Sequence, residues 1–516
     1  MRKPKQSGFI IAWVISLMVL MGFVITAAIS VIYLNLGNAT RNVSSQLALN
    51  ISEAGINYYL WHLSHYGADF KDGNSSASLI TSGEYTGYYG PFVHTYRDDN
   101  SKIAGTYTLY VKQKSVGSTV AMVKSIGKTS NGRIVRSSLA ELGAPSFASY
   151  GLAVNAEIWF GSTETANGPI HSNIGIHMDG PNTDDATSAN ATYVPSISKG
   201  GNGSTVRNAV WCNDGINCTT RTNTKNNGTW RYPVPPLDFA KITADRCSLK
   251  IQAFNDYAPT QGSATGSTPC NNVPNVRTNA YIPRYSSSGS FATNKGYLIE
   301  LNNNGTYNVQ KVDNENGCTR PYTSALTLNS SYKYTNLPIP PSGIIFVEDN
   351  VWIRSNPIFH GRVTVVASRQ ASNDTNKANI VAADDIEYST KNGQDALGLI
   401  SENSFIVPSY AAPAPGSSSS FPYKIHGAII AADSVYVPAS YDGCSTSKWT
   451  ASNNPMEFYG SITMDSGLWT WSYTDGTGFK YNSTVYDYNL LYAPPPFFPI
   501  TSTYDVLNWR EILARP

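Results

Sequence analysis

The stretch FIIAWVISLMVLMGFVITAAISVIYL, from Phe9 to Leu34, contains no charged side chain. Because a helix rises about 1.5 Å per residue, this segment spans about 39 Å. That length exceeds the ~30 Å hydrocarbon core of a bilayer, so the segment can cross with some tilt. The sequence therefore predicts a transmembrane helix over residues 9–34.

The residues before this helix, MRKPKQSG at positions 1–8, carry a basic cluster. Positive charge favours the cytoplasmic side, so we expect residues 1–8 inside and the bulk of the chain outside the cytoplasm. A secretory signal would have a shorter apolar core, of about 7 to 15 residues. We therefore predict a single-pass membrane protein.

The helix is expected to continue beyond the membrane. Residues 44–63 contain no proline, and their apolar positions recur at steps of three and four, as on one face of an amphipathic helix. These positions are Leu47, Ile51, Ala54, Tyr58 and Trp61. The sequence thus predicts one long helix over 9–65.

The same region carries a family resemblance. The leader ends in Ser7-Gly8, Phe9 follows, and Glu53-Ala54-Gly55 lies within LALNISEAGINYYLWHL. In these features the chain resembles the N-terminus of type IV pilin-like proteins of the PilX kind. The resemblance implies a prepilin leader over 1–8, cleavage between Gly8 and Phe9, and methylation of the new terminal amine. It also implies other pilin-like subunits as partners through the N-terminal helix.

One position departs from that family. Counting from Phe9, the fifth mature position is Trp13, where pilins of this family generally carry glutamate. The glutamate pairs with the terminal amine of a neighbouring subunit inside the membrane, where an unpaired charge is costly. A subunit without this glutamate is expected at a position where no further subunit lies above it in the filament. We therefore predict a minor, tip-located or priming subunit. An unprocessed signal anchor remains the alternative.

Composition bounds the remaining chain of this 516-residue protein. Charged residues make up 14% and the formal net charge is +2, with no basic run past the leader, which argues against a nucleic-acid partner. The chain is rich in Gly, Asn, Ser, Thr and Tyr, a composition that suits short strands and turns. The expected fold class is mainly β.

A small antiparallel sheet is predicted after the helix, in a domain over 66–144. Three alternating runs cover 104–114, 118–129 and 133–142, with turn signals between them. Residues 66–100 look loop-like. The segment VKSIGKTSNGRIVRSSLAEL, at 123–142, again resembles PilX-type proteins. We place the domain boundary near Pro145.

An internal repeat dominates the chain beyond that boundary. Four segments start at 343, 361, 379 and 398, so they lie 18, 18 and 19 residues apart, and related segments start at 151, 168, 427 and 460. This period is typical of one coil of a parallel β-helix, whose coils bury their inner faces only when stacked. The expectation is a right-handed β-helix over 145–516. Segments GPIHSN, DALGLIS and the C-terminal block resemble a domain of unknown function often found behind PilX-type N-termini.

An insertion interrupts the predicted repeat, and a cap is expected at its end. Residues 185–342 are expected as an insertion that holds a helix over 237–254 and a hairpin over 296–312, turning at Asn304-Gly305. Residues 485–516 are expected to form a proline-stiffened strap and a short terminal helix that cap the open end of the solenoid.

Cysteine usage fits an exported domain. An even number of cysteines on the exported side suggests disulfides, and their spacing lacks the close pairs that zinc sites use. Cys212 with Cys218 is the most plausible pair, although six cysteines allow 15 pairings. The disulfide candidates are Cys212, Cys218, Cys247, Cys270, Cys318 and Cys444.

Catalytic chemistry is not expected. The common hydrolase, nucleotide-binding and metalloprotease motifs are absent, so we predict no enzyme, no catalytic residues, no cofactor and no metal site. His171 and His177 share strand parity but are interpreted as hydrogen-bonding residues. Carboxylates recur at corresponding turns of the predicted coils without an accompanying Arg or Lys, and turn geometry explains them. They are Glu348, Asp349, Asp384, Asp385 and Asp433.

Three classes of function remain open. Tyrosine-rich GEYTGYYGPFVHTY, at 83–96, suits stacking on sugar faces, so a structural or adhesive pilus protein with a surface glycan or cell partner is favoured. A membrane-anchored β-helical carbohydrate-active enzyme is the first alternative. The second is a single-pass surface glycoprotein, because Asn-x-Ser/Thr sites are numerous. Examples of these sites are Asn190, Asn202, Asn304 and Asn482.

Overall fold

The computed structural model divides the chain into two compact units. Unit 1 comprises residues 1–112, 121–142 and 505–516, and unit 2 comprises 113–120 and 143–504. The structure describes all residues except 1–6, 67–68, 75, 115–119, 133, 214–228, 257–272, 274–275, 285–294, 318–320, 371–375, 412–421, 439–449, 473–477, 492, 502–503 and 514–516.

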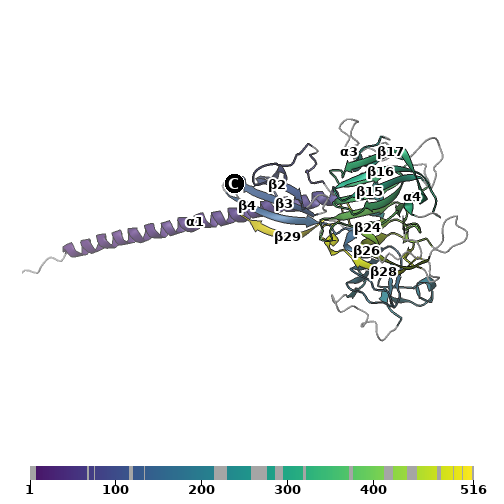
Figure 1. The fold of residues 1–516 in the computed structure, drawn as a ribbon. Coiled ribbons are helices and arrows are strands. Elements are labelled where there is room, and N and C mark those ends of the chain that lie inside the picture. Colours follow the sequence, from purple (N-terminus) through teal and green to yellow (C-terminus); the bar gives the residue numbers. More distant parts are fainter. Residues whose placement is uncertain are drawn as a thin grey trace, which may run out of the picture. The chain divides into compact units, whose positions relative to one another are not determined.

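Unit 1 is built on one long helix, α1, which runs from Ser7 to His65 (Figure 1). Among the described residues it is the one helix long and apolar enough to cross a membrane. Its residues 10–43 are exposed all round, whereas from Ala48 onward one face is buried. Thr26 and Ser30 satisfy their hydroxyls by donating to backbone carbonyls one turn earlier. Both parts of the predicted helix are therefore present.

A five-stranded sheet packs on the second half of α1. Its strand order is β1-β2-β3-β4-β29. The strands are β1 (Tyr89–Arg97), β2 (Ile103–Gln113), β3 (Val120–Thr129), β4 (Val135–Gly143) and β29 (Asp505–Ile512). The three predicted strands are confirmed as β2, β3 and β4. The prediction of a loop over 66–100 is wrong for β1, whose Gly90-Pro91 hides the strand pattern.

The predicted C-terminal helix is also wrong, because residues 505–512 form the edge strand β29 beside β4. The segment alternates apolar Leu507 and Trp509 with polar Asn508 and Arg510, which is the period of a strand. The two-residue period of this segment therefore indicates the observed strand, against its helix propensity. The C-terminus therefore belongs to unit 1 and not to a cap on unit 2.

Close approach of the sheet to α1 explains the glycine of the Glu53-Ala54-Gly55 motif. A Cβ at Gly55 would lie 2.3 Å from Ser125 Oγ, and one at Gly127 would lie 2.2 Å from the Ala48 carbonyl oxygen. The Ser52 hydroxyl donates to the Ser125 carbonyl at 2.9 Å, so helix and sheet are also joined by a buried hydrogen bond. At Gly127 the contact is with backbone, so only glycine fits there, whereas at Gly55 the close atoms belong to side chains of the sheet.

Unit 2 is dominated by two large sheets. The larger, of eleven strands, has the order β13-β9-β7-β5-β26-β24-β22-β20-β18-β14, with β28 on β26, and the other has the order β17-β16-β15-β19-β21-β23-β25-β27. The strands of the larger sheet are β5 (Leu152–Val154), β7 (Ile170–Ser172), β9 (Ala186–Ser188), β13 (Trp230–Arg231), β14 (Tyr281–Ile282), β18 (Ile344–Val347), β20 (Arg362–Ala367), β22 (Ala396–Ser401), β24 (Tyr423–Ala431), β26 (Thr450–Met464) and β28 (Gly478–Tyr486).

The second sheet and two small sheets complete the β-structure. The second sheet contains β15 (Gly296–Asn302), β16 (Thr306–Glu315), β17 (Leu326–Pro338), β19 (Asn350–Asn356), β21 (Ile380–Ala382), β23 (Phe405–Ile406), β25 (Val435–Tyr436) and β27 (Trp469–Thr470). The small sheets contain β6 (Ile158–Phe160), β8 (Ile176–Met178) and β12 (Val210–Trp211), and β10 (Thr192–Tyr193) and β11 (Arg207–Asn208).

From β18 to β27, consecutive strands alternate between the two large sheets. Each strand pairs in parallel with the next strand of its own sheet, as in the pairs Val365↔Leu399 and Ile380↔Phe405. The side chains of these four residues are fully buried in one core. This connectivity is what the predicted β-helix requires, while the closed, right-handed coil stays a prediction.

The stacking order differs from the chain order. Strand β5 pairs with β26 through Leu152↔Ile462, so the first repeats stack beyond the last ones. The predicted insertion over 185–342 needs correction, because it supplies strands at both ends of the larger sheet, β9 and β13 at one and β14 at the other. A repeat period gives the number of residues in a coil. It does not give the order in which the coils stack, so the sequence could not predict that order.

Other elements of residues 185–342 match the prediction. Helix α3 (Ala240–Asn255) lies at the predicted place, and β15 and β16 form the predicted antiparallel hairpin, with Gly305 at φ 72° in its turn. A short helix, α4 (Tyr322–Ala325), precedes β17.

The outer face of the larger sheet is covered by α3, by short 3-10 helices and by residues 493–498. The 3-10 helices here are η1 (Phe147–Ser149) and η4 (Tyr488–Leu491), and η2 (Ile197–Lys199) lies elsewhere in unit 2. The Arg362 guanidinium donates to the Ala493 carbonyl at 3.0 Å, and Phe498 packs in the same cluster as α3. The predicted strap thus lies across the face of the sheet and not over an open end.

Candidate functional site

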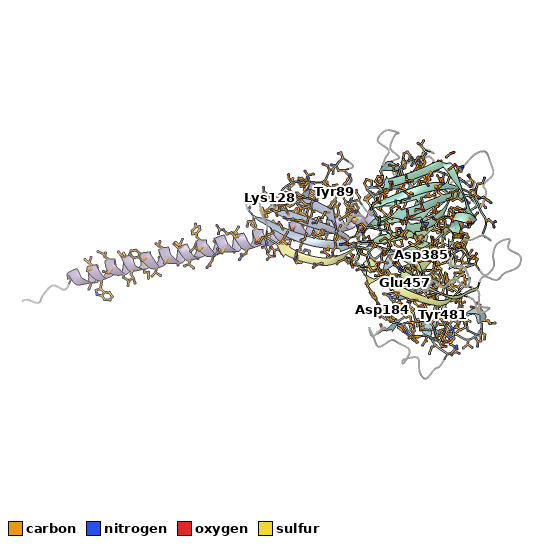
Figure 2. All side chains as sticks on the ribbon, in the orientation of Figure 1. Tyr89, Lys128, Asp184, Asp385, Glu457 and Tyr481 are labelled. Atoms are coloured by element: carbon orange, nitrogen blue, oxygen red, sulfur yellow. The ribbon has the colours of Figure 1, made fainter. Side chains whose placement is uncertain are left out.

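A row of charged side chains crosses the larger sheet of unit 2. We call Asp385, Glu387, Lys391, Lys424 and Glu457 the charged row. The first three precede β22, while the other two lie on β24 and β26, where they are paired in register. An isolated bridge between residues 386 and 425 holds the first segment against β24. Figure 2 labels Asp385 and Glu457 on the part of the molecule that these sheets form.

Ion pairs link the members of the charged row. Lys424 Nζ lies 2.6 Å from Glu387 Oε1, and the Lys424 backbone N–H donates to Asp385 Oδ1 at 2.8 Å. Lys391 pairs with Glu457. Each contact joins residues from different strands or turns, so the row ties neighbouring layers of the sheet together.

His426 lies directly behind this row and is almost fully buried. Its Nδ1 accepts from the Tyr388 backbone N–H at 3.0 Å, and its Nε2 lies 3.2 Å from Glu457 Oε1. Burial, helped by the nearby Lys391 charge, lowers the pKa of His426 to about 4. The imidazole is therefore neutral at physiological pH.

Asp385 differs from the other carboxyl groups of the charged row in its raised pKa. Burial raises the pKa of Asp385 to about 6, and the neighbouring charges of Asp384 and Glu387 add to this, while the Lys424 backbone N–H opposes it. A carboxyl with this pKa can take up or release a proton near neutral pH. The row thus combines one carboxyl of raised pKa, that of Asp385, with two carboxylates that pair with lysines.

The predicted corner carboxylates do not occupy equivalent corners. Glu348, Asp349 and Asp433 lie where the chain passes from the larger sheet to the second sheet, whereas Asp384 and Asp385 follow β21 in the opposite direction. Asp433 accepts from two serine hydroxyls, at 3.1 Å each, which is the turn role that the sequence favours. Their predicted equivalence is therefore wrong.

Cations do accompany these carboxylates, contrary to the sequence analysis. Lys250 Nζ of α3 lies 2.8 Å from Glu348 Oε1, and Arg369 pairs with Asp349 in an equally buried site. Arg354 lies 2.9 Å from Glu300 and 3.5 Å from Asp384. The cations come from α3 and from other layers of the array, so reading one repeat at a time misses them.

The two predicted hydrogen-bonding histidines are buried, and each makes a hydrogen bond through Nδ1. His171 Nδ1 lies 2.9 Å from Thr187 Oγ1, and burial lowers the pKa of His171. His177 Nδ1 donates to the Lys199 carbonyl at 2.8 Å. The histidines lie on β7 and β8, which belong to different sheets, so they do not line one face.

An aromatic stack surrounds His177, which the sequence analysis did not find. The His177 ring lies 3.9 Å from the Trp211 ring and 5.5 Å from the Trp159 ring, nearly parallel to both. The three residues are in register on β6, β8 and β12. Each of the three strands carries an aromatic side chain at the same register position. This pattern can be recognised in the sequence only when the stacking order of the strands is known.

The tyrosine-rich segment packs largely on its own unit. Tyr85 stacks on Tyr110 at 3.8 Å, and Lys124 Nζ lies over the Tyr85 ring at 4.4 Å. Tyr89 begins strand β1. These half-buried rings match the alternative that tyrosine suits strands.

The N-terminal processing residues lie at the start of α1. Gly8 and Phe9 are helical, and Trp13 is exposed on the apolar part of the helix. Residues 1–6 of the predicted leader lie outside the described part. Whether the Gly8-Phe9 bond is cleaved stays a prediction.

Two of the disulfide candidates are described. Cys212 and Cys247 are each disulfide-bonded. Cys218, Cys270, Cys318 and Cys444 lie outside the described residues, so the Cys212–Cys218 pair stays a prediction. Within the described part of the chain, no group of three or more His, Cys, Asp or Glu side chains is placed to hold a metal ion.

Comparisons with known proteins give little further information. No protein-family model and no curated protein matches the chain. A solved structure that it resembles is the competence-associated pilin ComZ from Thermus thermophilus, at 10% identity and a TM-score of 0.27 over 92% of this chain and 98% of that one. A score this low carries no argument about fold or function, so the proposals rest on the residues of this chain.

Proposed function

We propose that the chain is a minor, pilin-type surface protein of a type IV pilus or pseudopilus, with a structural or adhesive role. One observation carries this: a single helix has an apolar, exposed first half and a second half packed through Gly55 on a small sheet. Such a helix serves both as a membrane anchor and as the spine of an exported domain. Residues 1–8 would then be the leader, on the cytoplasmic side.

Trp13 supports a position at the filament tip. A subunit inside the filament would need a carboxylate at this place to pair with a neighbouring terminal amine. A tryptophan is compatible with lipid and places no charge there. We therefore propose a tip or priming subunit that contacts other pilin-like subunits through α1.

We also propose that the two large sheets of unit 2 are the faces of a right-handed parallel β-helix. The alternation of consecutive strands between the sheets supports this, and so does the shared core. A stacked array of this kind presents a long outer surface, which suits contact with a glycan or a cell.

A second candidate function is favoured by Asp385 alone. Its raised pKa beside Glu387 is the arrangement a carbohydrate-active enzyme would use for acid and base work. The test is release of reducing or unsaturated sugars from polysaccharides by the purified chain. Loss of that activity on Asp385→Ala, with Asp433→Ala unchanged, would favour this candidate.

The location of the chain in a filament tests the pilus proposal. A tag at an exposed position of unit 2 and gold-labelled antibody should mark filament tips. A Trp13→Glu variant should also appear along the filament, while Trp13→Phe should stay at the tip. Label along the whole length of wild-type filaments, or none on them, would contradict the proposal.

A further inference from the structure

The Asn-x-Ser/Thr sequences outside α1 differ in how the fold holds their asparagine. Such an asparagine accepts an N-linked glycan through its side-chain nitrogen, Nδ2, so the partner of that atom decides whether it can react. The sequences of this kind whose asparagine and Ser/Thr are both described begin at Asn74, Asn190, Asn202, Asn304, Asn329 and Asn482.

Asn304 lies exposed in the turn between β15 and β16. The Thr306 hydroxyl donates to Asn304 Oδ1 at 2.6 Å, and the Thr306 backbone N–H donates to the same oxygen at 3.2 Å. Gly305 between them has open space around it. Both hydrogen bonds end on the oxygen, so they orient the amide and leave Nδ2 without a partner among the described residues.

Asn74 of unit 1 has the same arrangement. The Ser76 hydroxyl donates to Asn74 Oδ1 at 2.7 Å, and the Ser76 backbone N–H donates to it at 3.2 Å. Asn74 is exposed, and its Nδ2 makes no hydrogen bond within the part of the chain that the structure describes. The two units therefore each present one oriented amide to solvent.

Two other asparagines use Nδ2 to hold the fold together. Asn190 Nδ2 donates to the Ile174 carbonyl at 3.1 Å. Asn329 Nδ2 donates to Asp313 Oδ2 at 2.8 Å, which joins β17 to β16. These nitrogens are engaged and must leave a partner before they can react.

The remaining two also lack the arrangement of Asn304. Asn202 Nδ2 donates to Thr205 Oγ1 at 2.7 Å. Asn482 lies on strand β28, where a residue two positions later is about 7 Å further along the chain, so the Thr484 hydroxyl is held away from the Asn482 amide.

The chemistry of glycan transfer explains why a free Nδ2 matters. This nitrogen bonds to the anomeric carbon of a glycan carried on a lipid pyrophosphate. The bond from that carbon to the pyrophosphate oxygen breaks, the lipid pyrophosphate leaves, and a proton of the amide passes to a base of the transferase. A nitrogen that already donates a hydrogen bond must first lose it.

We propose that Asn74 and Asn304 are acceptor sites for an N-linked glycan, one on each unit. A glycan is bulky and stays in solvent, and at these exposed turns it displaces no buried group. The inference depends on the predicted export of the chain and not on its place in a filament. It goes beyond the pilus role, because a filament subunit needs no glycan.

Peptides of the chain isolated from the cells that produce it give the first test. Mass spectrometry should find a glycan on Asn74 and Asn304 and bare Asn190 and Asn329. Bare Asn74 and Asn304, or equal occupancy of all four, would overturn the proposal. A chain that is processed and joins a filament but is bare at both sites would leave the pilus role standing.

The second test asks whether the fold makes the choice. The folded full-length chain in detergent is incubated with an oligosaccharyltransferase and its lipid-linked glycan. Asn304 should react about tenfold faster than Asn329, which must break a hydrogen bond. Synthetic peptides that contain the two sequences should react at similar rates. The same preference in the peptides would show that sequence decides, and would overturn the structural argument.

A variant and its control complete this test. Asp313→Ala frees Nδ2 of Asn329, so the rate at Asn329 should rise severalfold while the rate at Asn304 stays the same. Asp99→Ala, at an exposed acid in a turn of unit 1, should change neither rate. An unchanged rate at Asn329 in the Asp313→Ala chain would contradict the role assigned to the free nitrogen.

Discussion

Glycines at the start of the repeats are explained by backbone contact between layers. Gly427 and Gly460 are paired on β24 and β26, and a Cβ at Gly460 would lie 1.8 Å from the Gly427 carbonyl oxygen. At Gly398 a Cβ would lie 3.0 Å from Phe498 and from Pro495. These glycines therefore let strands pack and let residues 493–498 lie flat on the sheet.

We expect Gly460→Ala to lower the free energy of unfolding by roughly 3 kcal/mol or more, because the backbone must move to admit the methyl. Gly305→Ala is the control. That glycine also has a positive φ but open space around it, so about 1 kcal/mol is expected. Urea unfolding of both variants checks this, and similar losses would contradict the contact explanation.

The raised pKa of Asp385 predicts a pH-dependent stability difference. The folded state keeps this proton up to a pH of about 6, whereas the unfolded chain releases it near 3.8. The contribution of Asp385 is therefore full below pH 4 and is lost as the pH rises through 6. Asp385→Asn does not ionise, so it should match wild type at pH 4 and exceed it at pH 8 by up to about 3 kcal/mol.

This comparison cancels the effect of His426. That group has the opposite sign, since its lowered pKa costs stability as the pH falls toward 4, and it is present in both proteins. Unfolding by denaturant at a series of pH values gives the difference. A difference that is constant with pH would show that Asp385 is not buried as described.

Among the elements, helix α3 is held on the larger sheet by one buried ion pair, and a second buried pair lies beside it. Lys250 reaches Glu348 from α3, and Arg369 pairs with Asp349 beside it. Burial raises the pKa of Asp349, while the Arg369 charge opposes this shift. Removing one partner of such a pair leaves a buried charge uncompensated.

Arg369→Met should therefore lower the free energy of unfolding by about 3–5 kcal/mol. Adding Asp349→Asn to this variant removes the stranded carboxylate, so the double variant should recover part of the loss. Thermal or denaturant unfolding of the two singles and the double gives the coupling. Additive losses would mean that the pair does not interact.

At the scale of elements, local sequence patterns predicted more than distant ones. The strands β2 to β4, helix α3 and the β15–β16 hairpin follow from periodicity and turn residues within about 20 positions. Strand β1 was hidden by its proline, and β29 by a terminal position far from its partner β4. The charged row was not predicted as a site, because Lys424 meets Glu387 and Glu457 meets Lys391 only through the stacking of separate repeats.

On the scale of the whole molecule, unit 2 lies in the sequence between two neighbouring strands of unit 1. Strand β4 ends at Gly143 and β29 begins at Asp505, and the two are adjacent in one sheet. The small sheet is thus completed only by residues that follow the larger unit. This order of the chain could not be predicted from the repeat or from composition.

The central claim is that α1 is a processed pilin-type helix, and the N-terminus of the mature chain tests it most directly. The chain is coexpressed with a prepilin peptidase, and its intact mass and N-terminal peptide are measured by mass spectrometry. The account predicts a chain that begins at Phe9 with a methylated amine, and a Gly8→Val variant that keeps its leader. A wild-type chain that keeps residues 1–8 under these conditions would contradict it.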